Sequence, residues 1–204
     1  MARAGAIPGT DGWIERPAEV DRVVAALTSG DGGLVTVVPE AGGVEGMGVT
    51  AVVAAALHRS EVAEHFTEGV GWVNAGGAGP EQWIPELVDV LGHLYGEEDQ
   101  FQAQLDDIPD IHDEDAVSEV MEEMIFTPGA RLVVIDGLPN TVQVAPLVFR
   151  MPGWTWLVTT AVADDLPEFA VTVPVGPMAS AQAVELLRRD LPELEEGRPP
   201  GWRS

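Results

Sequence analysis

The sequence predicts an α/β fold: a three-layer α/β/α sandwich built on a mainly parallel, five-stranded sheet. Short runs of apolar and β-branched residues, each bounded by glycine or proline, are typical of strands buried on both faces. Segments of helical length separate these runs, and strands joined in this way form parallel βαβ units with right-handed crossovers. A chain of 204 residues, 46% of them hydrophobic, is long enough to bury one core, so we expect a single domain over residues 1–204.

The first βα unit is the most distinctive part of this pattern. Helix 17–28 is predicted because Pro17 suits a first helical turn and apolar residues then recur at helical spacing. Strand 34–38 is a short apolar, β-branched run bounded by glycines, and a glycine-rich loop, 39–48, follows it directly. The alanine- and valine-rich segment 49–59 is then predicted to be a helix buried on most sides.

The middle of the chain repeats the alternation of strand and helix. Strand 69–74 precedes helix 81–95, in which Trp83, Leu87 and Leu91 recur at helical intervals. Residues 96–123 contain many Asp and Glu and no arginine, which indicates a solvated acidic loop over 96–113 and the outer face of a helix over 114–126.

Three further strands and one helix complete the prediction. The strands, 131–136, 154–160 and 171–175, are short, β-rich and bounded by Gly or Pro. The last helix, 180–189, begins at Ser180, a residue type that caps helix N-termini. Residues 1–12 are expected to be flexible, and residues 192–204 are expected to form a tail.

Charge and residue usage exclude several classes of function. The formal net charge is −24, and a field of that sign repels nucleic acid and anionic lipid, so neither is expected as a partner. All ten basic residues are arginine, which excludes any mechanism that needs a lysine ammonium group. Cysteine is absent, so disulfides, thiol catalysis and cysteine zinc sites are excluded too. The N-terminus lacks the apolar stretch of a secretory signal, and cytoplasmic residence is expected.

The glycine-rich loop carries the main functional signal. Residues 43–50, GVEGMGVT, fit the phosphate-binding pattern G-x-x-x-x-G-K-[ST] at every fixed position except the lysine, which is Val49. In such a loop, backbone N–H groups and a helix N-terminus point at the phosphates while lysine neutralises them. Val49 supplies no neutralisation, and Glu45 adds like-charge repulsion. A lost charge-assisted hydrogen bond is worth about 1.5–3 kcal/mol, so nucleotide binding is expected to be weak.

A second signal lies on strand 131–136, where four apolar residues end in Asp136. This is the arrangement in which a strand-end carboxylate holds Mg²⁺ beside a phosphate-binding loop. The following residue is Gly137, so no second carboxylate is adjacent to polarise an attacking water.

Together these elements resemble the STAND NTPases of NB-ARC type, particularly actinobacterial regulators, over nearly the whole chain. The supporting segments are 14–17 (IERP), 43–50, 65–66 with 68–73 (HF and EGVGWV), 132–137 (LVVIDG), 157–160 (LVTT), and 177–178 with 183–187 (PM and AVELL). In that family, LVTT is followed by an arginine that reaches the γ-phosphate, and here the position is Ala161. The loop and the resemblance together assign a vestigial or weak nucleotide site to Arg16, Gly43, Glu45, Gly46, Met47, Gly48, Val49, Thr50, Asp136 and Thr160. Thr50 and Asp136 would hold the metal if a magnesium nucleotide binds.

The favoured hypothesis is a catalytically inactive domain that acts as a protein-interaction or regulatory scaffold in signalling, with a protein partner or a homo-oligomer and no cofactor. The alternative is a switch domain that binds ADP or Mg-ATP at low affinity without efficient hydrolysis. A third hypothesis, an active ATPase that uses Arg16 or another arginine in place of the lysine, has less support. The family continues into a helical domain and a winged helix, so the chain is expected to be either a minimal core or a fragment.

Other signals carry less weight. The four histidines, His58, His65, His93 and His112, have no metal-ligand spacing. The aspartates of segment 106–115 lack the glycine turn and terminal glutamate of a calcium loop. No G-x-S-x-G elbow is present, which leaves acyl-transfer hydrolysis unsupported.

Overall fold

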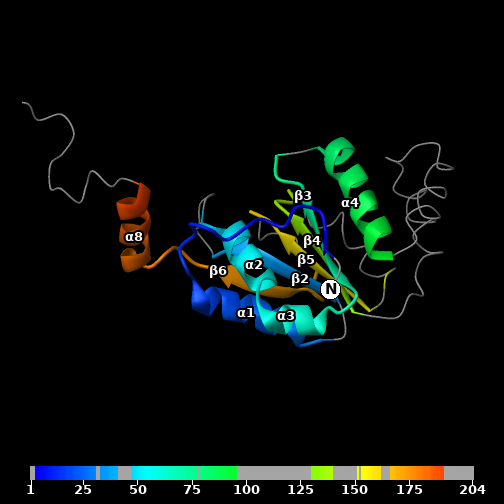
Figure 1. The fold of residues 1–204 in the computed structure, drawn as a ribbon, viewed down its shortest axis with the longest axis horizontal. Helices are drawn as coiled ribbons and strands as arrows, with labels where there is room; N and C mark the ends of the chain where they lie inside the picture. The colour runs from blue at the N-terminus through cyan, green and yellow to red at the C-terminus, as the bar shows by residue number, and fades with distance from the viewer. Residues whose placement is uncertain are drawn as a thin grey trace, which may run out of the picture.

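The structure, a computed structural model, describes residues 3–30, 33–40, 47–77, 79–95, 130–139, 151, 153–161 and 166–190. Its centre is a six-stranded sheet in the order β1-β3-β4-β5-β2-β6, and every strand pair is parallel (Figure 1). The strands are β1 (Arg3–Ala4), β2 (Gly33–Pro39), β3 (Gly69–Asn74), β4 (Arg131–Asp136), β5 (Trp154–Thr159) and β6 (Val171–Val175). The five predicted strands are all present, and the parallel α/β fold is confirmed.

The short strand β1 is an addition that the sequence does not predict, because residues 1–12 read as a flexible segment. Arg3 and Ala4 pair with Val70 and Gly71 of β3. The chain then turns at Gly5, whose φ is +73°. A Cβ at Gly5 would lie 1.9 Å from the carbonyl oxygen of Trp72, so only glycine permits this close passage. Two paired residues are too few to produce a strand pattern in the sequence.

The described helices are α1 (Pro17–Thr28), α2 (Val49–Leu57), α3 (Ser60–His65), α4 (Pro80–Tyr95) and α8 (Ser180–Asp190). The predicted helix 49–59 ends earlier than expected, at Leu57. The N–H groups of His58 and Arg59 bond to Ala55 and Ala56, three residues back, which tightens and closes the last turn. The separate helix α3 was not predicted. The acidic loop 96–113, helix 114–126 and tail 192–204 lie outside the described residues.

The helices cover both faces of the sheet. Helices α1, α2 and α3 lie on one face, where Val23, Leu27 and Phe66 join strand residues in one core cluster (Figure 1). Helix α4 lies on the other face, where Trp83 and Leu91 pack with Trp156. This arrangement confirms the predicted sandwich.

Gly71 explains how closely α4 approaches the sheet. A Cβ at this β3 position would lie 2.3 Å from Cγ1 of Val90 on α4. The glycine therefore gives the helix room to pack directly on the strand. The cost is entropic, because glycine loses more backbone freedom on folding than other residues do.

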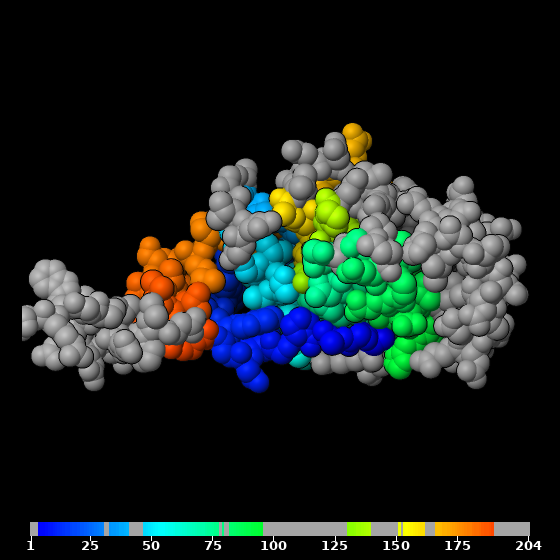
Figure 2. Space-filling view, turned by 90° about the horizontal axis from the view of Figure 1, so that it is seen from above, coloured from blue at the N-terminus to red at the C-terminus, as the bar shows by residue number. Residues whose placement is uncertain are grey.

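Helix α8 begins differently from the serine cap that the sequence suggests. Ser180 is already the first helical residue, and the side chain of Gln182 accepts the N–H of Ala179 instead, at 3.0 Å. A glutamine at the third helical position makes this half of a capping box. The amide of Gln182 also donates to the Glu15 carbonyl at 2.7 Å, which ties α8 to the N-terminal segment. Figure 2 shows α8, in orange, at one end of the molecule.

The topology places the carboxyl ends of β2, β4 and β5 at one edge of the sheet. Strand β2 lies between β5 and β6: the strands β3, β4 and β5, which follow it in sequence, lie on one side of it, and β6 lies on the other. Open parallel sheets bind ligands at such a switch point, outside the carboxyl ends of the strands. No helix of the described residues has both the length and the apolar character needed to cross a bilayer.

Candidate functional site

The N-terminus of α2 forms one side of the site. Gly48 precedes the helix with φ +78°, a left-handed conformation that favours glycine, and its carbonyl accepts the N–H of Val52 at 3.0 Å. Val49, at the position of the missing lysine, is half-buried and packs against the core beneath α1 and α2. The aliphatic side chain therefore serves packing at a position where a cation would face a phosphate.

Thr50 and Asp136 contact each other directly, although 86 residues separate them in sequence. The Thr50 hydroxyl donates to both carboxylate oxygens, at 3.0 and 3.1 Å. Asp136 is 8% exposed and stands at the end of β4. The two residues that the sequence assigns to a metal are thus brought together.

Thr159, at the end of β5, completes this cluster. Its hydroxyl donates to Oδ1 of Asp136 at 2.6 Å and accepts the N–H of Gly137 at 2.7 Å. Sequence reasoning selected Thr160 instead. Thr160 is buried, and its N–H donates to the carbonyl of Val37 at 3.2 Å. The sequence carries no signal that separates the two residues, because the choice depends on the register of β5 against β4.

Arg16 lies beside the loop, and its terminal guanidinium nitrogens are engaged with two backbone carbonyls and one carboxylate. Its guanidinium donates to the carbonyls of Met47 and Gly176, each at 2.6 Å, and to the carboxylate of Glu19 at 2.8 Å. The side chain is 3% exposed, and its Nε has no hydrogen-bond partner among the described residues. Burial raises the pKa of Glu19, but the hydrogen bond and charge of Arg16 help to lower it below its ordinary 4.5. Arg16 is therefore a connector between α1, the loop and the end of β6.

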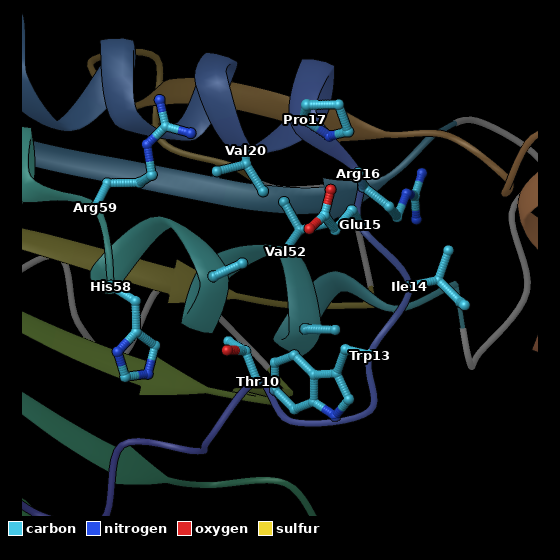
Figure 3. Close-up of a pocket in the computed structure, with 12 residues that line it drawn as sticks. Thr10, Trp13, Ile14, Glu15, Arg16, Pro17, Val20, Val52, His58 and Arg59 are labelled. Atoms are coloured by element: carbon cyan, nitrogen blue, oxygen red, sulfur yellow. The ribbon is translucent and has the colours of Figure 1, made fainter.

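Two cavities flank the N-terminus of α2. The phosphate-side cavity, about 390 Å³, is lined by Trp13, Pro39, Met47, Gly48, Val49, Thr50, Ala51, Gly137, Thr159, Thr160 and Ala161. The second cavity has a volume of about 330 Å³ and lies between α1, α2 and the N-terminal segment; we call it the strap-side cavity because that segment runs along it like a strap (Figure 3). It is lined by Thr10, Trp13, Ile14, Glu15, Arg16, Pro17, Val20, Ala51, Val52, Ala55, His58 and Arg59. Trp13 and Ala51 belong to both. The sequence-based site omits Trp13, although it lies beside the segment 14–17 that supports the resemblance.

The position after Asp136 is closed to a side chain. Gly137 has φ +80°, and a Cβ there would lie 2.6 Å from Cα and 2.9 Å from N of Gly76. The turn after β3 therefore occupies the space that a second carboxylate would need. Gly76 itself is held by a 3.0 Å hydrogen bond from its N–H to Oδ1 of Asn74.

The structure thus brings together most of the predicted site that it describes. Met47, Gly48, Val49, Thr50, Thr160 and Asp136 meet around the phosphate-side cavity, and Arg16 holds its rim. Gly43, Glu45 and Gly46 lie outside the described residues. A hydroxyl and a carboxylate are oxygen ligands of the kind that Mg²⁺ prefers, so Thr50 and Asp136 fit a metal carried by a nucleotide. Within the described residues, no cluster of three or more His, Asp or Glu side chains could hold a metal alone.

The order of the parallel strands, the helices on both faces of the sheet and the Thr50–Asp136 pair are consistent with a P-loop NTPase-like α/β fold. Solved structures show the same fold. A signal transduction ATPase with numerous domains (STAND) with a tetratricopeptide repeat sensor, from Pyrococcus horikoshii, matches 95% of this chain with a TM-score of 0.52 and 17% identity. The ORC1 protein of Aeropyrum pernix in complex with DNA matches 92% with a TM-score of 0.54 and 17% identity.

These likenesses establish the fold and extend only over part of each neighbour. The chain covers 27% of the STAND protein and 51% of the ORC1 protein. No protein-family model matches the sequence, and the comparison with curated proteins also gave no match.

Proposed function

We propose that this chain is a catalytically inactive, NB-ARC-like P-loop domain that acts as a protein-interaction or regulatory scaffold in cytoplasmic signalling. The observation that supports the proposal is the lining of the phosphate-side cavity: within the described part of the chain, none of its eleven lining residues has a charged side chain. Phosphoryl transfer depends almost entirely on positioning and on neutralising the charge of the phosphates. The described lining of this cavity provides no side chain that could neutralise the phosphates.

Three positions lack the catalytic side chains that the resemblance implies. Val49, Gly137 and Ala161 stand where the resemblance implies a lysine, a second carboxylate and an arginine, and all three line the cavity. Arg16 is the nearest alternative cation, but it is committed to two carbonyls and to Glu19. Moving it to a phosphate would take this donor from three partly buried acceptors, which argues against the hypothesis that Arg16 substitutes for the lysine.

A protein partner fits the surface better than nucleic acid. The ORC1 neighbour is bound to DNA, but the net charge of −24 on this chain opposes approach to a phosphate backbone. Val184 and Leu187 of α8 are 45% and 52% exposed, and exposed apolar side chains on one helix are typical of protein contact surfaces. Size-exclusion chromatography with light scattering distinguishes a homo-oligomer from a monomer that awaits another protein.

Hydrolysis is the direct test of the proposal. We expect no phosphate release above background from Mg-ATP or Mg-GTP with the wild-type chain, and the same result with Thr50→Ala and Asp136→Asn. Turnover by the wild type that both substitutions abolish would overturn the proposed inactivity, because contaminating activity would not respond to them.

A second candidate function is a switch domain that binds ADP or Mg-ATP weakly and does not hydrolyse it efficiently. The Thr50–Asp136 contact favours it, since both oxygen ligands for a nucleotide-bound Mg²⁺ are in place. Thermal unfolding with ADP and Mg²⁺ tests it, because a ligand that binds only the folded state raises the melting temperature. A shift with ADP that disappears in Asp136→Asn would support the switch over the empty scaffold.

A further inference from the structure

Helix α8 is attached to the rest of the molecule through its polar side. The side-chain amide of Gln182 donates to the Glu15 carbonyl at 2.7 Å. The guanidinium of Arg189 lies beside Gly12, where a Cβ would be 3.7 Å from Nη1 of the arginine. Gln182 and Arg189 are seven residues, or about two helical turns, apart, so they share one side of the helix. This side of α8 therefore faces the N-terminal segment.

The apolar side chains of α8 point the other way. Each residue advances about 100° around a helix, so Val184 lies about 200° from Gln182, and Leu187 lies about 200° from Arg189. Val184 and Leu187 are neighbours on one side, since they are three residues apart. We call the surface formed by Val184 and Leu187 the α8 face.

The α8 face is open in this structure. Val184 is 45% exposed and Leu187 is 52% exposed, and none of the described side chains of α8, Ser180–Arg189, is buried. Figures 1 and 2 both show the helix beyond β6, at one end of the molecule. A surface helix usually buries its apolar side and exposes its polar side. The opposite orientation of α8 leaves an apolar surface that another molecule can cover.

A second copy of this chain is poorly suited to cover the α8 face. Each copy carries a formal charge of −24, so two copies repel each other. Helix α8 has two acidic and two basic residues, and a two-fold contact between two such neutral helices offers no net charge to offset the repulsion. The helix is also only about 16 Å long, too short to bury alone the roughly 1,200 Å² of a stable interface.

We propose that the α8 face binds an amphipathic helix of another protein, one that carries a positive net charge. Apolar side chains at helical spacing on that partner pack on Val184 and Leu187. The negative charge of the chain steers a basic partner toward this surface and raises the rate of association, while the apolar contact holds the complex. The inference rests on the proposed function in one respect, that the domain acts through a protein partner. It adds the place and the chemistry of that contact.

The test is fluorescence anisotropy with a labelled synthetic helix that has leucine at positions i, i+3, i+4 and i+7 and lysine on its other sides. A second peptide, with glutamate in place of every lysine, keeps the apolar side and reverses the charge. We expect the full chain to bind the lysine peptide, with an affinity that falls as salt is added. The glutamate peptide should bind about tenfold or more weakly.

Leu187→Glu separates the apolar contact from general attraction between opposite charges. The substitution makes the chain more acidic, so it would strengthen a complex held by charge alone, whereas we expect about a tenfold or greater loss of affinity for the lysine peptide. Val171→Glu is the matched control, because it adds the same charge at a side chain that is 49% exposed. Val171 begins β6, whereas α8 follows the other end of that strand, so this variant should bind as the wild type does.

Four outcomes overturn the inference. They are no binding of the lysine peptide to the folded wild type, equal affinity for the glutamate peptide, binding that Leu187→Glu leaves unchanged or strengthens, and a wild-type dimer in light scattering that Leu187→Glu dissociates. The last would assign the α8 face to a second copy. Phosphate release tests the proposed inactivity separately: a chain that neither hydrolyses Mg-ATP nor binds the peptide loses only the inference about α8.

Discussion

The hydroxyl of Thr159 lies 2.6 Å from Oδ1 of Asp136, and it accepts the N–H of Gly137 at 2.7 Å. One side chain on β5 therefore holds both the carboxylate at the end of β4 and the turn that follows it. The Thr50 hydroxyl approaches the same carboxylate from α2. The hydroxyl groups of Thr50 and Thr159 thus link α2 and β5 to the buried carboxylate at the end of β4.

Thr159→Val should destabilise the domain because it leaves both the Asp136 carboxylate and the Gly137 N–H without this partner. A hydrogen bond to a charged group is worth about 1.5–3 kcal/mol, and urea unfolding should show a loss of that order. Thr159→Ser keeps the hydroxyl and should recover most of the loss. Destabilisation by Ser but not by Val would show that methyl packing, and not the hydrogen bond, matters at this position.

Gly137→Asp should destabilise the chain and should not produce ATPase activity, even when combined with Val49→Lys. A Cβ at this position would lie 2.6 Å from Cα of Gly76, and φ of +80° adds strain for any L-residue. Forced backbone conformations of this kind cost about 1–3 kcal/mol each. Gly137→Ala is the control: it should be as destabilising as Asp, since the clash arises at Cβ. A stable double variant with phosphate release would contradict the steric argument.

The sequence predicts the central fold well because its signals are local and strong. Buried β-branched runs define β2, β4 and β5, and the proline and apolar spacing define α1, which has the predicted bounds. Strand β1 and helix α3 are missed because two and six residues are too short for a periodic pattern. The predicted end of α2 is two residues too late, because hydrogen bonds from the N–H groups of His58 and Arg59 to carbonyls three residues back close its last turn, and composition does not reveal such bonds.

The site is predicted less completely because contacts between distant segments decide it. The spacing of residues 43–50 and the acid at Asp136 predict the site, and within the described residues Thr50 contacts Asp136. The choice between Thr159 and Thr160 depends on strand register, which a single sequence does not show. The lack of space for a side chain at Gly137 is due to Gly76, which lies in the turn after β3, and no sequence motif predicts the position of that turn.

Arg16→Lys should destabilise the domain although it conserves the charge. The arginine fork reaches the carbonyls of Met47 and Gly176 and the carboxylate of Glu19 together, whereas an ammonium group on a flexible stem cannot match that geometry. Loss of one such bond costs about 1.5–3 kcal/mol. Arg22→Lys, at an exposed position of the same helix, is the control and should have little effect. Matching midpoints in urea for both variants would argue against the connector role.

The Arg16–Glu19 contact also predicts a specific dependence of stability on pH. Burial raises the pKa of Glu19, but the hydrogen bond from Arg16, with the backbone and charge effects, brings the folded-state pKa below the ordinary 4.5. A carboxyl with a depressed folded-state pKa stabilises the fold above its unfolded pKa, and this contribution is lost as pH falls through the folded pKa. The wild type should therefore exceed Glu19→Gln in free energy of unfolding by a constant amount from about pH 7 to pH 5.5, and the difference should shrink below about pH 4.5. Chemical unfolding of both proteins across this range measures the difference while the other carboxylates titrate equally in each. A difference that persists unchanged to pH 3, or one that is already absent at pH 7, would show that the ion pair adds nothing of this kind.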